Sequence, residues 1–215
     1  MLLSSNRSAA ALASGRTNRI AMLARERLAG WFMGELFDGL YDELSRARYD
    51  LTVYRAGSVE ERAEFFTRLP ANRNADALIV SGFSAGGHLA ASLGVFWDKD
   101  WLAKETGLTA EQMRPNGLLL SYPVITSGTY AHHGSIENLM GTKKSKELKE
   151  LLSLEHQVGK QVPPVFIWHT LTDQSVPIQN TLMFTEALVK NQVSVEAHIF
   201  PEGLHGLSLA NEETQ

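Results

Sequence analysis

A chain of 215 residues, 44% of them hydrophobic, can bury a sizeable core as one large domain or as two small ones. Its 20 Lys and Arg side chains against 24 Asp and Glu give a formal net charge of -4, which argues against nucleic acid or anionic lipid as a general partner. The absence of cysteine excludes disulfides, thiolate zinc sites and cysteine nucleophiles, so a hydroxyl or a carboxylate must supply any nucleophile.

The amino-terminal residues do not have the basic stretch and apolar run of a secretory signal. No later segment reaches the ~20 apolar residues that a helix needs to cross a bilayer. We therefore expect a cytoplasmic protein without a membrane partner. The sequence leaves its oligomeric state open.

Apolar runs alternate with amphipathic stretches along the chain, a pattern that predicts parallel strands joined by crossover helices. After the first expected strand, apolar residues recur every four positions from Phe32 to Leu44, which predicts a helix. After the second, Ser58 stands three residues before Glu61, the spacing of a capping box at a helix start. The six expected strands are residues 19–24, 49–54, 75–82, 117–122, 165–169 and 195–200.

The segment of residues 127–164, between the fourth and fifth expected strands, is too long for a simple crossover. It contains Gly128, Gly134 and Gly141, followed by the charged run of residues 143–150. We expect it to pass over the top of the sheet, where it is long enough to cover a site. Its individual side chains are expected to be solvated and without direct chemistry.

The strongest signal of chemistry is Gly82-Phe83-Ser84-Ala85-Gly86, which follows the third expected strand and precedes a helical stretch. This is the G-x-S-x-G pattern of a nucleophilic serine on a sharp turn, where small neighbours let the backbone approach itself. The backbone N–H of Ala85, at the start of the helix, is expected to donate to an oxyanion. The alternative is a glycine-rich turn with an incidental serine, which the flanking strand and helix disfavour.

A serine nucleophile needs a base to take its proton, and the base needs a carboxylate to hold its tautomer. Asp173 follows the fifth expected strand and His205 the sixth, at the carboxyl edge of a parallel sheet, where ligands bind. Taken alone, Asp173 suggests a turn or helix-cap residue and His205 a surface histidine. Together, in this chain order after Ser84, they predict a catalytic triad.

The other histidines are poorer candidates for the base because of where they fall. His88 lies inside the helix after Ser84, and His169 and His198 lie inside strands, where His169 is expected to be a satisfied core or supporting residue. Three more lie in the segment of residues 127–164: His132, His133 and His156. Adjacent histidines do not have metal-ligand spacing, so no metal and no cofactor is expected.

From Gly82 onward the chain resembles the small-molecule esterase and acetyl-xylan-esterase branch of the α/β-hydrolase family. The resemblance rests on GFSAGGHLAASLG, NGLLLSYPV, PPVFIWHTLTDQSVP and FPEGLHGLSL. It implies that Ser84, Asp173 and His205 are the catalytic triad and that Ala85 is one oxyanion donor. It also implies a small-molecule substrate, a short acyl ester such as an acetyl group on carbohydrate.

Residues 1–81 instead resemble the start of the effector-binding domain of lac-repressor-type regulators, through SNRSAAALASGRTNRIAML, ELFDGLYDELSRARYDLTVY and ADALIVSG. The DNA-reading helices of those regulators are missing, so DNA binding is not expected. The two resemblances imply a chimera, of natural or engineered origin, in which residues 1–81 replace the matching part of a hydrolase and residues 82–215 carry the chemistry. We then expect one domain with a single doubly wound, mainly parallel six-stranded sheet in the order 2-1-3-4-5-6 and helices on both faces.

The hydrolase resemblance also bears on the second oxyanion donor, which that family supplies from a His-Gly-Gly sequence. This chain has residues 25–31 there, in which the backbone N–H of Ala29 or Gly30 is the candidate donor. Losing one such donor costs ~3 kcal/mol of transition-state stabilisation. A hybrid scaffold with weak or no activity is therefore the alternative to a serine carboxylesterase. Sugar binding inherited from the regulator part is a weaker alternative, because the second subdomain of that cleft is absent.

Overall fold

The computed structural model describes residues 16–24, 31–55 and 75–207, and groups the chain into two compact units, Met1–Leu78 and Ile79–Gln215. The predicted capping box at Ser58 lies outside the described residues. Among the described residues, no helix combines the length and the apolar character needed to span a membrane.

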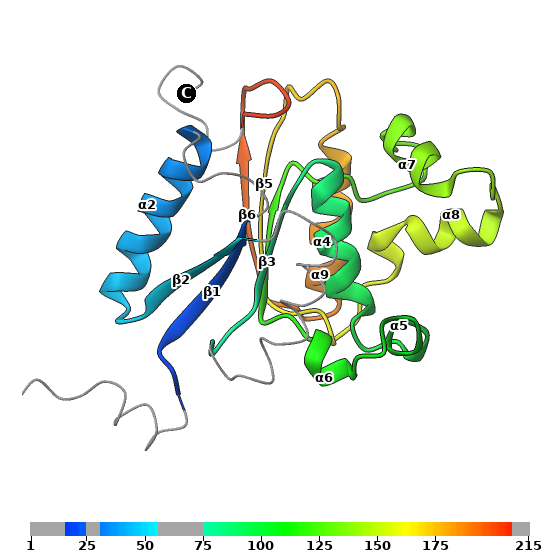
Figure 1. Cartoon of the computed structure of the whole chain (residues 1–215). Helices are drawn as coiled ribbons and strands as arrows, with labels where there is room; N and C mark the ends of the chain where they lie inside the picture. Colours follow the sequence, from blue (N-terminus) through cyan, green and yellow to red (C-terminus); the bar gives the residue numbers. More distant parts are fainter. Residues whose placement is uncertain (1–15, 25–30, 56–74, 208–215) are drawn as a thin grey trace, which may run out of the picture. The chain divides into compact units, whose positions relative to one another are not determined.

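The described part of the first unit contains two parallel strands, with a helix between them along the chain (Figure 1). β1 (Arg19–Ala24) pairs with β2 (Asp50–Arg55) from Arg19 opposite Asp50 to Ala24 opposite Arg55. α2 (Trp31–Arg46) turns Leu36, Leu40 and Leu44 to its half-buried side, as the spacing from Phe32 to Leu44 predicts.

Near the end of the first unit, the side chain of Asp76 binds the residues that lie just before β1. Asp76 Oδ1 accepts hydrogen bonds from the backbone N–H and the hydroxyl of Thr17, and Oδ2 accepts one from the backbone N–H of Asn18. Burial raises the pKa of Asp76, but these hydrogen bonds outweigh it and lower the pKa overall. The next residue, Ala77, forms an isolated parallel bridge with Ile20.

In the second unit, the residues up to 207 form a parallel four-stranded sheet with strands in the order β3-β4-β5-β6. The strands are β3 (Ile79–Phe83), β4 (Gly117–Ser121), β5 (Val165–Thr170) and β6 (Val195–Phe200). Because all four are parallel, their carboxyl ends meet at one edge (Figure 1).

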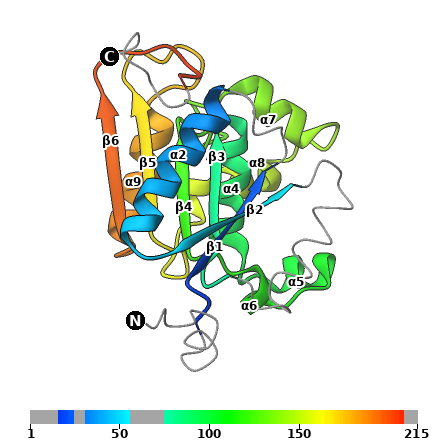
Figure 2. The same cartoon turned by 60° about the vertical axis from the view of Figure 1, so that its left-hand side comes forward.

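The two long helices of this unit cover the same face of the sheet (Figure 2). They are α4 (Ala85–Phe96) and α9 (Gln179–Lys190). Between α4 and β4 come the short helices α5 (Asp100–Thr106) and α6 (Ala110–Met113). The core lies between this face and the two long helices, with Val95, Leu120, Ile167 and Phe184 fully buried.

The long segment after β4 is folded, and the expectation of solvated side chains holds for only part of it: residues 143–147 are exposed, whereas Ile136, Met140 and Leu154 are buried. It contains α7 (His133–Met140), α8 (Lys146–Leu152) and the 3-10 turn η1 (Leu154–His156). Ile136 and Met140 on α7 pack with Val124 and Val176 into a second, smaller apolar cluster. The helical spacing of the apolar residues places them on one side of α7, and burial of that side in the cluster stabilises the segment.

The prediction of one continuous six-stranded sheet is not confirmed, since the structure describes a two-stranded and a four-stranded sheet. The strand orders inside each sheet agree with the prediction. The third strand begins at Ile79 and is therefore shorter than expected. Just before it, the side chain of Asp76 accepts hydrogen bonds from the backbone of residues 17–18, and such local side-chain bonds compete with strand pairing. The expectation of a single domain stays a prediction.

Candidate active site

Ser84 lies on a sharp turn between β3 and α4, with a φ of 53° and a ψ of -122°. The chain comes so close to itself here that a Cβ on Gly82 would lie 2.2 Å from the carbonyl oxygen of Gly86. Backbone hydrogen bonds hold the turn: Ser84 N–H donates to Ser121 O at 3.0 Å, and Ser84 O accepts from Val124 N–H at 3.0 Å. The end of β4 therefore fixes the serine in place.

The structure brings the three predicted triad residues into one hydrogen-bonded chain. His205 Nε2 lies 2.8 Å from Ser84 Oγ, and His205 Nδ1 lies 2.6 Å from Asp173 Oδ2. Asp173 stands on the loop after β5 and His205 on the loop after β6, at the edge where β3 delivers the serine. The ring of Tyr122 packs edge-on against His205 at 5.0 Å between centroids and limits the positions the imidazole can take.

The Asp173 carboxylate is buried and accepts four hydrogen bonds. Its Oδ1 accepts from the backbone N–H groups of Ser175 and Val176, at 2.8 and 2.9 Å. Its Oδ2 accepts from both His205 and His169. Burial raises the pKa of Asp173, but the hydrogen bonds from His205 and from the two N–H groups outweigh it and lower the pKa overall. An ionised Asp173 favours the His205 tautomer with a proton on Nδ1, which leaves Nε2 free to take a proton from Ser84.

Only one of the two predicted oxyanion donors lies within the described residues. Ala85 is the first residue of α4, so its N–H has no acceptor within the helix and stands beside the serine. Gly30, the predicted second donor, lies outside the described residues.

Two threonines that the sequence reading missed join the loop of Asp173 to the loop of His205. Thr170 Oγ1 and Thr172 Oγ1 both donate to the carbonyl oxygen of Gly203, at 2.9 and 3.0 Å. The N–H of Gly203 in turn donates to Thr172 Oγ1 at 2.8 Å. In the sequence, two hydroxyl residues beside a turn indicate that their side chains hydrogen-bond to nearby backbone groups, but they do not indicate that the partner is Gly203.

The remaining histidines, apart from His169, do not join this chain. His88 is buried in α4 and its Nδ1 donates to the carbonyl oxygen of Val124, while burial lowers the pKa of the ring. His132 caps α7 by accepting from Ser135 N–H. Within the described parts of the chain, no group of three or more His, Cys, Asp or Glu side chains is arranged to hold a metal ion.

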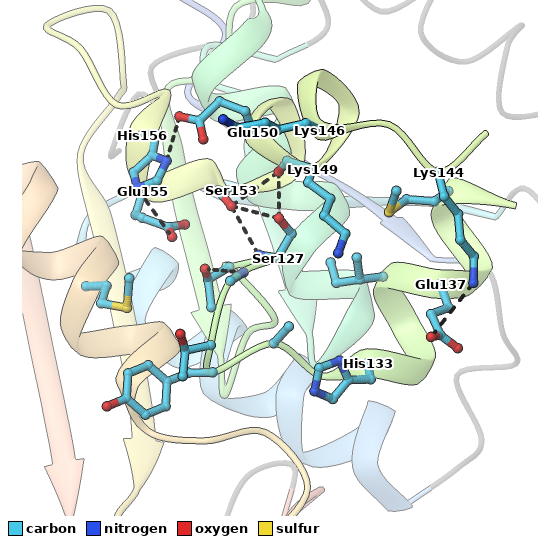
Figure 3. Close-up of a pocket in the computed structure, with 18 residues that line it drawn as sticks. Ser127, His133, Glu137, Lys144, Lys146, Lys149, Glu150, Ser153, Glu155 and His156 are labelled. Atoms are coloured by element: carbon cyan, nitrogen blue, oxygen red, sulfur yellow. Dashed lines mark hydrogen bonds and ion pairs between the residues drawn. The ribbon is translucent and has the colours of Figure 1, made fainter.

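A separate cavity of about 650 Å³ lies among α7, α8, η1 and the loop after β4 (Figure 3). Its lining is rich in charge of both signs, including Lys149, Glu150 and Glu155, and contains none of the three residues of the hydrogen-bonded chain. The cavity is therefore distinct from the place where Ser84 stands.

Among the proteins that this chain is similar to are two matched by sequence and one matched by structure. Over 157 residues the chain is 41% identical to endo-1,4-beta-xylanase B of Butyrivibrio fibrisolvens, a match that covers 71% of this chain and 24% of that protein. Over 140 residues it is 28% identical to an acetylxylan esterase of Xylanibacter ruminicola, covering 63% and 27%. The chain thus spans about a quarter of the length of these two proteins.

The third relative is a solved structure, the acetyl ester-xyloside bifunctional hydrolase from Caldicellulosiruptor lactoaceticus. It matches at 30% identity with a TM-score of 0.65, over 89% of this chain and 75% of that one. A match over 89% of the chain extends into the first 81 residues, and none of these comparisons supports the lac-repressor resemblance or a chimera.

Fold and sequence give the same family assignment. The parallel sheet with its helices is that of an α/β-hydrolase, as in the structural relative. A sequence model described as BD-FAE matches residues 70–188, which is more than half of the chain. With Ser84, Asp173 and His205 meeting at the carboxyl edge of that sheet, we conclude that the chain belongs to the BD-FAE family.

Proposed function

We propose that the chain is a serine esterase that hydrolyses short acyl esters, acetyl esters on carbohydrate foremost, through Ser84, His205 and Asp173. The observation that carries the proposal is the unbroken hydrogen-bonded chain from Ser84 Oγ through His205 to the buried carboxylate of Asp173. The names of the relatives, a xylanase, an acetylxylan esterase and an acetyl ester-xyloside hydrolase, support carbohydrate as the alcohol part.

In this mechanism Ser84 Oγ attacks the carbonyl carbon of the ester while His205 Nε2 takes the hydroxyl proton. Negative charge develops on the carbonyl oxygen, and the N–H of Ala85 donates to it, with the N–H of Gly30 as the proposed second donor. His205 then gives its proton to the leaving alcohol, which leaves an acyl group on Ser84. Water, deprotonated by the same histidine, attacks the acyl carbon and releases the acid. Asp173 stays ionised and stabilises the imidazolium in both steps.

The test is hydrolysis of p-nitrophenyl acetate by the chain beside its Ser84→Ala variant, with cooperative unfolding of both as the fold control. We expect the wild-type chain to turn over and the variant to lose at least about a thousandfold in kcat. If both are folded and equally slow, the proposal is wrong and the chain is a scaffold without turnover.

Substrate class is tested separately from the chemistry. We expect acetic acid to be released from acetylated xylan by the wild-type chain and not by Ser84→Ala, and p-nitrophenyl octanoate to be hydrolysed more slowly than the acetate. If the chain hydrolyses p-nitrophenyl acetate but releases no acetic acid from acetylated xylan, the assignment as a serine esterase stands and acetylated carbohydrate is rejected as its substrate class.

A further inference from the structure

His169, at the end of β5, is fully buried and makes three polar contacts. Its Nε2 lies 3.1 Å from Asp173 Oδ2 and 3.0 Å from the carbonyl oxygen of Val176. Its Nδ1 lies 2.8 Å from the hydroxyl oxygen of Thr181 on α9. Both nitrogens therefore have partners, although the triad mechanism uses neither.

These partners determine where the ring proton lies. Both neighbours of Nε2 are acceptors, so Nε2 carries the proton and donates to Asp173 and Val176. Nδ1 then accepts from the Thr181 hydroxyl. A neutral ring satisfies every contact, and burial lowers the pKa of His169 despite the nearby Asp173 charge, which keeps the ring neutral.

Asp173 Oδ2 is thus shared between two histidines, His205 from the loop after β6 and His169 from β5. Among the described residues, these two are the only side chains that hydrogen-bond to the Asp173 carboxylate. In the part of the chain that the structure describes, the hydrogen-bond and ring contacts of His205 are with Ser84, Asp173 and Tyr122.

We propose that His169 is a positioning residue that sets the basicity of His205 through the shared oxygen Asp173 Oδ2. The inference rests on the proposed function, because it concerns the same base. A donor on Oδ2 withdraws electron density from that oxygen and weakens its attraction for the His205 imidazolium. The same bond, together with the two N–H groups that donate to Oδ1, holds the carboxylate that His205 contacts in one orientation.

A residue that only fills the core would behave differently on substitution. Losing packing lowers stability without changing the hydrogen bonds that Asp173 Oδ2 accepts, whereas losing the donor on Oδ2 strengthens the remaining bond to His205. His205 would then titrate at a higher pH, and the acid limb of the kcat/KM profile would move upward with it.

The experiment follows the His205 ring by NMR as pH is varied, with a His205→Gln spectrum for assignment, in wild type, His169→Leu and His169→Gln. His169→Leu keeps bulk without a donor, and we expect His205 to titrate at a higher pH and kcat to fall ~10–100-fold, as for other residues that orient a reacting group. The amide nitrogen of His169→Gln stands near the position of Nε2 and can donate to Asp173, so this variant should titrate close to wild type.

A folded His169→Leu in which His205 titrates as in wild type, or at lower pH, overturns the inference. If that variant does not fold, Thr181→Val is measured instead, since it removes only the hydroxyl that orients the His169 ring. A smaller shift in the same direction is expected, and no shift overturns the inference. Absence of Ser84-dependent turnover in wild type would reject the proposed function alone, because the NMR titration needs no turnover.

Discussion

Ser84 holds a backbone conformation that residues other than glycine rarely adopt, with a φ of 53°. Such a conformation costs on the order of 1–3 kcal/mol and persists only where neighbouring contacts outweigh it. Here those contacts are the bonds from Ser84 to Ser121 and Val124 at the end of β4. The strain raises the hydroxyl above the sheet edge, where His205 reaches it.

The two glycines of the serine motif have different roles, which a pair of variants separates. In Gly82→Ala the new Cβ would collide with the backbone of Gly86, so we expect the free energy of unfolding to fall by about 1–3 kcal/mol or more. In Gly86→Ala the Cβ meets no atom within 4 Å, and the change should stay within about 0.5 kcal/mol. Urea denaturation measures both. Equal destabilisation of the two variants would contradict the close approach at Gly82.

The lowered pKa of Asp173 links the stability of the site to pH. A carboxyl whose folded pKa lies below its ordinary value of 3.8 contributes stability that is fully present above that value. This contribution is lost as pH falls through the folded pKa. We therefore expect the difference in unfolding free energy between wild type and Asp173→Asn to be largest above about pH 4 and to narrow below it. Urea denaturation of both from pH 7 to pH 3 tests this, and a constant difference would contradict it.

At the scale of elements, the site depends on two loops that come from different strands. The loop after β5 supplies Asp173 and the loop after β6 supplies His205. Thr172 and Gly203 bind each other by two hydrogen bonds across these loops. A shift of about an ångström at a catalytic group can cost a hundredfold in rate, so these bonds matter more for turnover than for stability.

We expect Thr172→Val to lower kcat about tenfold or more while the free energy of unfolding falls by only about 1 kcal/mol. Thr172→Ser keeps the hydroxyl and should restore most of the rate. Thr142→Val is the matched control, because Thr142 is exposed between α7 and α8 and its hydroxyl makes no hydrogen bond to the described residues. Turnover of p-nitrophenyl acetate and urea denaturation are the measurements. A rate in Thr172→Val equal to that of the control would exclude a role for this pair of bonds.

At the scale of the whole molecule, the two units differ in how well each could be stable alone. The described part of the first unit holds one helix on a two-stranded sheet, and such a sheet is marginally stable by itself. The second unit has four strands and a core of fully buried residues on α4, β4, β5 and α9.

We therefore expect the chain to unfold in one cooperative transition, as the single-domain prediction requires. Trp31 belongs to the first unit, while Trp97, Trp101 and Trp168 belong to the second. In the Trp31→Phe variant, whose tryptophan fluorescence reports only the second unit, the midpoint in urea should equal that of far-UV circular dichroism, which reports both units. Two separate midpoints would show that the units fold independently and would reject a single domain.

The sequence by itself determined the features that depend on neighbours along the chain. β1, β4 and β6 begin where the apolar runs begin, and α2 follows the four-residue spacing of Phe32 to Leu44. The spacing of apolar residues and the secondary-structure propensity of each residue act over a few neighbouring positions, so both can be read from a single sequence. Ser84 was predictable for the same reason, because its turn needs glycine at Gly82.

Only the tertiary structure decided which segments meet. The sharing of Asp173 Oδ2 by His169 and His205, and the bonds between Thr172 and Gly203, join residues from separate strands and loops. The division into two sheets and the second apolar cluster around Ile136 likewise follow from packing. Hydrogen-bond partners and buried contacts far apart in the chain depend on distance in space, which the spacing of residues in a single sequence does not contain.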